Sequence, residues 1–158
     1  MKSFALLLFA VSAWAQLPVS VGLKGGYVNN RAPDREVFPL KGGPYLELSL
    51  PFLPTIETGI LFERFEGFGS RSNMVYQVPV LIKKRINAVA IKPFFAAGLT
   101  FRQIPSLNSS NPGITLAGGV TLGLLPIKIE PEIRYTRWTS ADFPPRIQQT
   151  EFLIGIRF

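Results

Sequence analysis

The sequence predicts an all-β fold, an eight-stranded antiparallel up-and-down transmembrane β-barrel preceded by a cleaved signal peptide. Three observations support this prediction. Apolar and polar residues alternate along eight segments, which is the period of a strand with two different faces. The connections between the segments are alternately short and long, as expected when all tight turns lie at one end of a barrel. The polar face carries charges of both signs and many glycines, which suits a narrow interior.

The composition limits the chemistry that the chain can perform. Of its 158 residues, 47% are hydrophobic and 17% are charged, so one globular domain is expected and a disordered chain is excluded. The sequence contains no cysteine and no histidine. These absences exclude disulfides, thiol nucleophiles, imidazole bases and the usual zinc sites. We therefore expect no catalytic residue, no cofactor and no metal site.

The first fifteen residues have the pattern of a secretory signal peptide. Lys2 supplies a positive start, residues 4–14 are apolar, and Ala13-Trp14-Ala15 fits a cleavage site. The apolar run is too short to span a bilayer as a helix. Residues 1–15 are thus predicted to be a signal peptide and residues 16–158 a single barrel domain.

The eight strands are predicted at residues 17–27, 46–50, 56–63, 74–83, 91–102, 114–124, 127–136 and 151–158. One face of each is apolar, and in chain order it carries Val19, Val21 and Leu23; Leu46 and Leu48; Ile56, Ile60 and Phe62; Tyr76, Val78 and Val80; Phe95, Ala97 and Leu99; Ile114, Leu116 and Leu122; Ile129, Ile133 and Tyr135; Phe152, Ile154 and Ile156. The other face carries Gly22 and Lys24; Glu47 and Ser49; Glu57, Gly59 and Glu63; Gln77 and Lys83; Lys92, Gly98 and Arg102; Thr115, Gly119 and Thr121; Lys128, Glu130, Glu132 and Arg134; Glu151, Gly155 and Arg157.

The connections fix the topology. Residues 53–54, 86–90 and 125–126 are short, whereas 28–43, 66–73, 104–112 and 140–149 are long. An even number of strands then places both termini at the tight-turn end. Pro79, Pro93 and Pro131 fall inside strands, where a missing N–H removes a ladder bond, so we expect local bulges or bends there.

The apolar face is predicted to point outward, toward lipid. It carries too many large side chains for the core of an eight-stranded barrel. Its aromatic residues gather toward the long-loop ends, as in a membrane-interface girdle: Tyr27, Phe62, Tyr76, Phe101, Tyr135 and Phe152. A soluble lipocalin-like carrier, which reverses the two faces, stays open as an alternative.

Three segments resemble strands of the PorT-like outer-membrane β-barrel domain family. Residues 76–83 read YQVPVLIK and look like its Y-x-x-P-x-L-x-K strand. Residues 92–98 resemble its K-P-Y-x-x-x-G strand, with Phe94 in place of the tyrosine, and residues 131–135 are similar to its P-E-x-R-Y strand. The resemblance covers residues 16–158 and implies a small eight-stranded outer-membrane barrel, without implying an activity.

Three groups of candidate functional residues follow from this fold. An interior charge cluster with a structural role is expected from Lys24, Glu57, Lys92, Arg102, Glu130, Glu132, Arg134, Glu151 and Arg157. Arg64 and Arg137 break the alternation at the long-loop ends, where they are expected to contact lipid headgroups. Phe152, Ile154, Ile156 and Phe158 are similar to the C-terminal insertion signal of outer-membrane barrels.

The resulting functional prediction is a non-enzymatic bacterial outer-membrane barrel with a structural, membrane-integrity or surface-interaction role. A narrow channel for small solutes stays open as an alternative. The expected partners are outer-membrane lipid, lipopolysaccharide and the barrel-assembly machinery, the expected state is a monomer, and both termini are expected in the periplasm. The net charge of +7 does not indicate nucleic-acid binding, because most strand bases are predicted inside the barrel.

Overall fold

The computed structural model describes residues 18–29, 40–49, 53–66, 72–86, 91–105, 109–124, 127–139 and 148–158. The predicted signal peptide, residues 1–15, and the charged segments that join the strands lie outside these ranges. Within the described ranges, no helix is long and apolar enough to cross a membrane.

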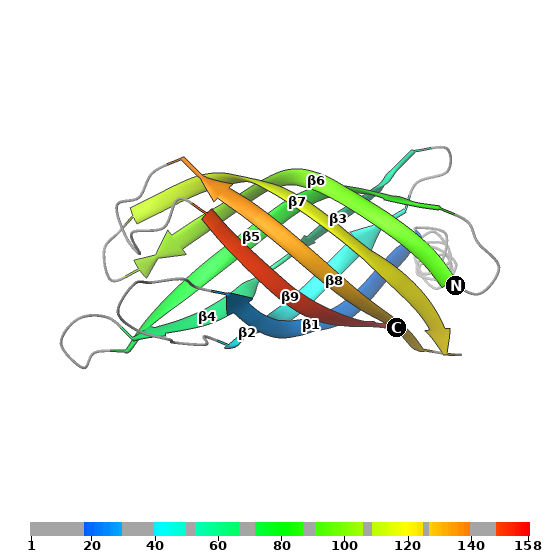
Figure 1. Cartoon of the computed structure of the whole chain (residues 1–158), viewed down its shortest axis with the longest axis horizontal. Helices are drawn as coiled ribbons and strands as arrows, with labels where there is room; N and C mark the ends of the chain where they lie inside the picture. Colours follow the sequence, from blue (N-terminus) through cyan, green and yellow to red (C-terminus); the bar gives the residue numbers. More distant parts are fainter. Residues whose placement is uncertain are drawn as a thin grey trace, which may run out of the picture.

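The described residues form one closed antiparallel barrel (Figure 1). β1 pairs with both β2 and β9, which closes the sheet. The strands are β1 (Val19–Asn29), β2 (Leu40–Leu48), β3 (Thr55–Gly59), β4 (Leu61–Glu66), β5 (Ser72–Arg85), β6 (Ile91–Ile104), β7 (Ser109–Leu124), β8 (Ile127–Trp138) and β9 (Gln148–Arg157).

β3 and β4 are two halves of a single crossing, so the barrel has eight crossings, as predicted. Both halves keep one register against β2 and one register against β5. The ladder is interrupted only around Ile60. Pro44 on β2 and Pro79 on β5 lie beside this point, and neither has an N–H to donate. Ile60 still donates its own N–H to the Pro44 carbonyl at 3.0 Å.

The prolines inside strands do not produce the bulges that the sequence predicted. Pro79 pairs with Thr100 and Pro93 pairs with Val120, and the register is the same on both sides of each proline. Beside Pro131, the β7–β8 ladder stops after Gly119↔Glu132 and resumes at Leu122↔Ile129 in the same register. A proline removes a donor but adds no residue to the strand, so the pairing continues beyond it.

Two strands begin five or six residues earlier than the sequence predicted. β2 starts at Leu40 rather than near Leu46, and β7 starts at Ser109 rather than near Ile114. Gly42 and Asn111 are turn-type residues, yet they pair with Gly25 and Arg102. Closure of the barrel supplies a neighbouring strand on each side, and this outweighs the weak local strand preference of such residues.

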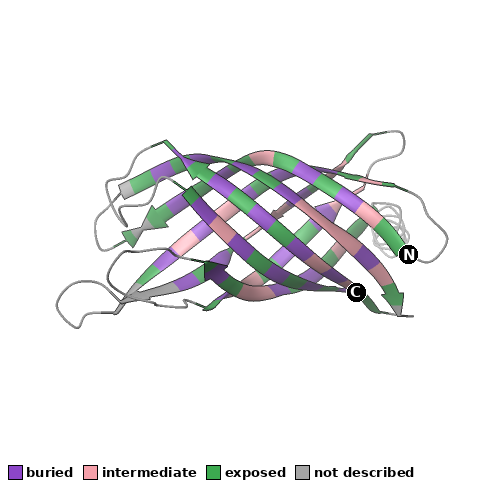
Figure 2. Ribbon diagram, in the orientation of Figure 1, coloured by how far each residue is buried: buried purple, intermediate pink, exposed green. Residues whose placement is uncertain are grey.

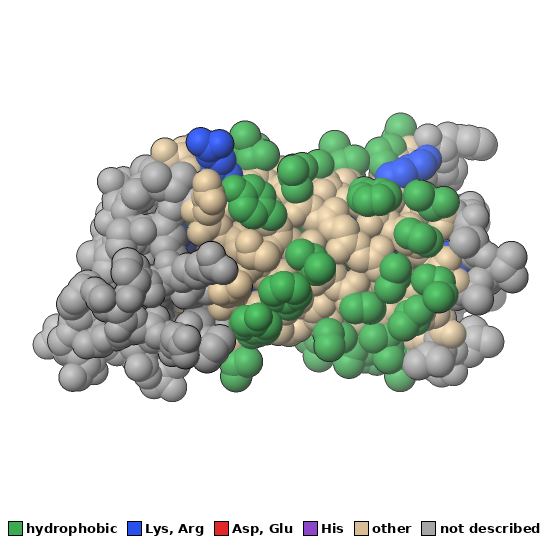
Figure 3. All heavy atoms as spheres, in the orientation of Figure 1, with side chains coloured by type: hydrophobic (Ala, Val, Ile, Leu, Met, Phe, Trp, Pro, Cys, Tyr) green, Lys and Arg blue, Asp and Glu red, His purple; other side chains and the backbone are tan. Residues whose placement is uncertain are grey.

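The two faces of the wall have the predicted orientation. Buried and exposed residues alternate along the strands (Figure 2). The outward side chains are apolar and open, with Leu23 56%, Ile82 58% and Ile154 56% exposed. Figure 3 shows apolar side chains across the middle of one face, with Lys and Arg at its two edges. An apolar surface of this extent is unusual for a soluble monomer, and a soluble carrier with an apolar lumen disagrees with this arrangement.

Candidate functional site

The lumen of the barrel is filled by ionised side chains. Among the described residues, the buried bases are Lys24, Lys41, Lys83, Arg102, Arg134 and Arg157, and the buried acids are Glu47, Glu57, Glu63, Glu130, Glu132 and Glu151. The two sets are equal in number. Because an unpaired charge in a protein interior costs several kcal/mol, equal numbers of buried bases and acids favour folding by allowing the charges to pair.

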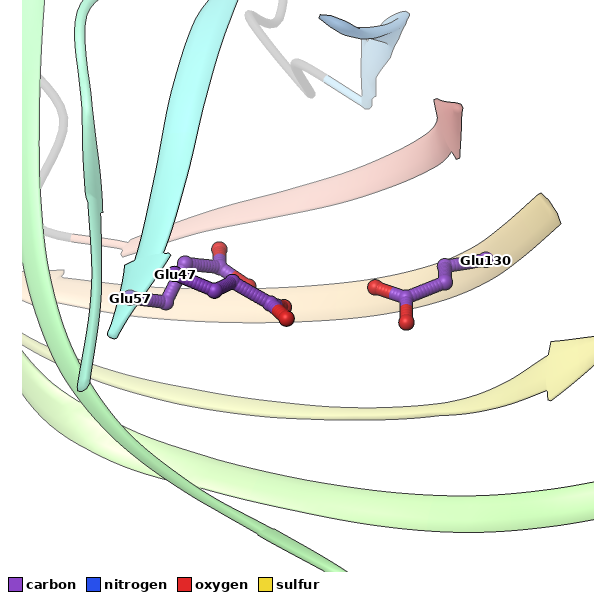
Figure 4. Close-up of side chains that lie close together, drawn as sticks. All are labelled: Glu47, Glu57 and Glu130. Carbon is purple, nitrogen blue, oxygen red and sulfur yellow. The ribbon is translucent and has the colours of Figure 1, made fainter. Parts of the chain in front are cut away.

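The buried charges form two clusters. Lys83 on β5 lies at the centre of the first, which also contains Glu47, Glu57 and Glu130. Its ammonium donates to Glu47 at 2.7 Å, Glu57 at 2.9 Å and Glu130 at 2.8 Å. Glu47 and Glu57 are cross-strand partners on β2 and β3, whereas Glu130 extends from β8 across the lumen (Figure 4). Their carboxylate oxygens lie within 4.8 Å of one another, a spacing that suits a metal ion. The Lys83 ammonium already bonds all three carboxylates, so we interpret the group as an ion-pair cluster.

Two arginines complete this cluster. Arg85 forms ion pairs with Glu47 at 2.6 Å and Glu130 at 3.0 Å. Arg157 on the last strand bonds Glu47 and lies 3.3 Å from Glu130. Three bases thus neutralise three acids, and the like charges on paired strands, which would otherwise repel, are bridged.

Glu57 links this cluster to the middle of the barrel. Lys24 on β1 donates to Glu57 at 2.5 Å and to Glu132 at 2.7 Å. Arg134 forms ion pairs with the same two carboxylates, at 3.0 Å and 2.7 Å. The network therefore connects β1, β2, β3, β5, β8 and β9 through charge-assisted bonds, which are stronger than neutral ones.

A second cluster lies toward the long-loop end. Lys41 on β2 bonds Glu151 on β9 and donates to Gln77 at 2.7 Å. Gln149 donates to Glu151 at 2.6 Å, and Trp138 donates its indole N–H to Gln149 at 3.1 Å. These side-chain bonds join β2, β5, β8 and β9 near this end of the barrel.

Three aromatic rings fill the space between the charges, and each follows one pattern. Tyr45, Phe94 and Trp138 pair directly across the ladder with glycines, namely Gly22, Gly119 and Gly113. Each ring also receives a cation: Lys24 lies 4.7 Å from the Tyr45 ring centre, Lys83 lies 4.0 Å from that of Phe94, and Arg102 lies 4.4 Å from that of Trp138. The glycines on the inner face thus give room to aromatic rings, which in turn hold cations.

The structure brings most of the predicted interior residues together. Those buried in the lumen are Lys24, Glu57, Arg102, Glu130, Glu132, Arg134, Glu151 and Arg157. Lys92 departs from the prediction, because it is exposed. It is the second residue of β6 and pairs with Thr121 near the tight-turn end of the barrel.

Sequence reasoning placed Lys41 in a loop and omitted Tyr45 and Trp138 from the interior. All three are buried, Lys41 with 3% of its surface exposed. Counting back by twos from Glu47 reaches Tyr45 and Lys41, so the alternation held a usable signal. The run Gly42-Gly43-Pro44, which resembles a turn, concealed it.

The predicted surface residues divide into two groups. Arg137 is exposed on the outer face of β8, whereas the side chain of Arg64 lies outside the described part of the structure. The terminal residues Phe152, Ile154, Ile156 and Phe158 all face outward, and Phe158 is 65% exposed.

Comparison with solved structures identifies the class of fold. Neisserial surface protein A aligns with a TM-score of 0.67 and 12% identity over 88% of this chain and 95% of that chain. Ail, the attachment invasion locus protein of Yersinia pestis, aligns at 0.54 and 14% identity over 89% of this chain and 96% of that one. The outer-membrane enzyme PagL aligns at 0.52 and 10% over 89% and 98%. The chain has the fold of the small eight-stranded outer-membrane barrels.

No protein-family model matches the chain, and no curated protein matches it in sequence. The resemblance to the PorT-like family therefore stays a prediction.

Proposed function

We propose that the protein is a monomeric, non-conducting and non-enzymatic barrel of the bacterial outer membrane, with a structural or membrane-integrity role. The single observation that carries the proposal is the lumen, in which twelve buried ionised side chains occupy the axis. A path for ions would require these pairs to separate, and breaking a buried pair costs about 3–5 kcal/mol. The exposed apolar face supports the membrane location, because water does not stabilise such a surface.

The non-enzymatic part of the proposal rests on residue content. PagL is an enzyme of the same fold, so the fold alone does not decide the matter. A histidine-dependent triad cannot be built from this chain, because its sequence has no histidine. The six buried carboxylates are held in ion pairs with lysine or arginine, which leaves them little freedom to act as acids or bases.

Conductance tests the closed lumen. Residues 16–158, refolded and inserted in planar bilayers, are expected to give no steady single-channel openings. The double variant Lys83→Ala with Arg134→Ala, which removes two central bases, is expected to give openings or leakage. Steady openings of the unaltered barrel would favour the alternative of a narrow channel.

Cell fractionation tests the location, and epitope labelling tests the topology. The full chain is expected in the outer-membrane fraction, with a gel mobility that changes on heating. An epitope inserted between β4 and β5 is expected to be labelled on intact cells, and the same epitope between β5 and β6 is not, because we propose that both termini and the tight turns are periplasmic. Lipid, lipopolysaccharide and, during insertion, the assembly machinery are the proposed partners. Recovery in the soluble fraction would refute the proposal.

A further inference from the structure

A hollow lies on the outer wall of the barrel, over β1, β9, β8 and β7. Its volume is about 470 Å³, and its lining includes Tyr27, Gly118, Pro131, Ile133, Phe152 and Ile154. Tyr27 pairs with Phe152, Phe152 pairs with Ile133, and Ile133 pairs with Gly118, so one row of outward residues crosses four strands. Gly118 has no side chain, and it pairs on its other side with the exposed Phe95 of β6. The missing side chain at Gly118, between Ile133 and Phe95, creates the depression.

One side of the hollow is a rigid aromatic wall. The rings of Tyr27 and Phe152 are stacked, with centres 5.3 Å apart and planes 12° from parallel. The floor is formed by Gly118 and Pro131, near the point where the β7–β8 ladder is interrupted. Figure 3 shows backbone and side chains of other types (tan) among the apolar side chains on one face of the barrel. The hollow is therefore apolar, preformed and open to the medium that surrounds the wall.

A cation lies above the hollow on the same strand. Arg137 is exposed and lies four residues beyond Ile133, on the same face of β8, with Tyr135 between them. At about 3.4 Å per residue and a strand tilt of about 40°, Arg137 lies roughly 10 Å nearer the membrane surface than Ile133. One bilayer leaflet has about 15 Å of hydrocarbon, so a lipid with its phosphate at Arg137 would reach the hollow with its acyl chain.

The sign of the surface charge favours an anionic ligand. The acidic side chains that the structure describes are all buried, whereas the exposed charged side chains are basic: Lys84, Lys92, Lys128 and Arg137. A phosphate at Arg137 therefore meets no described acidic group on the outer wall, and the guanidinium offers a fork of donors that matches phosphate oxygens.

We propose that the hollow and Arg137 together bind one molecule of lipid A, with an acyl chain over Gly118 and a phosphate on Arg137. The proposal rests on the proposed function, which places the long-loop end of the barrel in the outer leaflet, where lipid A resides. It deepens that function by assigning the lipid contact to one side of the barrel.

Two variants test the two halves of the site. Gly118→Leu fills the hollow, and its Cβ has ordinary contacts, the nearest being 3.8 Å from the Phe95 ring, so the strand is expected to fold normally. Arg137→Gln removes the charge. Ala97→Leu adds similar bulk to the outer wall away from the hollow, and Lys84→Gln removes an exposed cation at the other end. Ile133→Trp fills the hollow from its wall should Gly118→Leu fail to fold.

The measurement is native mass spectrometry of the refolded barrel in a neutral detergent with added lipid A, and in parallel with added phosphatidylglycerol. We expect one retained lipid A, at least a fivefold loss of retention in Gly118→Leu and in Arg137→Gln, and less than a twofold change in both controls. Loss in Arg137→Gln alone, or equal retention of phosphatidylglycerol, would overturn the assignment. A barrel that folds in detergent, changes gel mobility on heating and retains no lipid A would refute this site while leaving the proposed function intact.

Discussion

Replacing Gly119 by alanine tests the packing of the lumen most directly. A Cβ at this position would lie 2.7 Å from the Cζ atom of Phe94 and closer still to the Pro131 carbonyl oxygen. Neither neighbour can move freely, because Phe94 is 1% exposed and its ring holds the Lys83 ammonium. Overpacking of this kind costs about 1–3 kcal/mol. The adjacent charge cluster shifts with the ring, so we expect a loss of about 2–3 kcal/mol in the free energy of unfolding.

Gly118→Ala is the matched control, one residue away on the same strand. Its Cβ would have its nearest neighbours at 3.8 and 3.9 Å, which is ordinary contact. Removing a glycine also reduces the entropy of the unfolded chain, which is worth about 0.4–1 kcal/mol. The control is therefore expected to be as stable as the unaltered protein, or slightly more so.

Urea unfolding of the refolded domain 16–158 provides the assay. The sequence has two tryptophans, and Trp14 falls in the predicted signal peptide, so the fluorescence of this domain reports on Trp138 alone. Trp138 is 2% exposed inside the barrel, and its emission should shift to longer wavelength as the lumen opens. Equal stability of the Gly119→Ala and Gly118→Ala variants would refute the account in which glycines make room for interior rings.

Three further predictions follow from the interior and the last strand. Lys83→Met removes a base that bonds three buried carboxylates, so we expect the free energy of unfolding in urea to fall by about 3–5 kcal/mol. Lys92→Met, at an exposed position, is the control and should change this free energy by less than about 0.5 kcal/mol. Similar losses in both variants would contradict the burial argument. Tyr45→Phe removes a buried hydroxyl that has no hydrogen-bond partner among the described residues, so it should stabilise the barrel by about 1 kcal/mol in the same assay. A marked loss of stability in this variant would contradict the prediction. Deletion of Phe158 should slow insertion in cells, seen as more unfolded chain on unheated gels, while the refolded protein keeps its stability; unchanged insertion would remove this residue from the proposed signal.

The alternation of apolar and polar residues predicted the strands and the outward direction of the apolar face. It could do so because each strand of a closed barrel has one face on the apolar outer surface and the other on the charged lumen. The sequence was less informative where local and global preferences conflict. Gly42, Gly43 and Pro44 favour a turn, yet barrel closure pairs this stretch and buries Lys41 and Tyr45 on either side of it. Lys92 is the opposite case, a predicted interior residue that is exposed. The alternation places it on the inner face but does not show how far along each strand the closed lumen extends. The ion-pair partners required the register between strands, which a single sequence does not contain.

The interruption between β3 and β4 has a consequence for how the wall comes apart. Pro44 on β2 and Pro79 on β5 lack amide donors, and these two strands flank the β3–β4 crossing on either side near Ile60. Hydrogen exchange should therefore be fastest for the amides that flank this seam, and a pulling force on β2 should separate it from β3 before any other pair. The pairing of β2 with β3 is therefore the expected starting point for separation of the strands. The Lys83 ammonium opposes this separation from the lumen, because it bonds both Glu47 on β2 and Glu57 on β3.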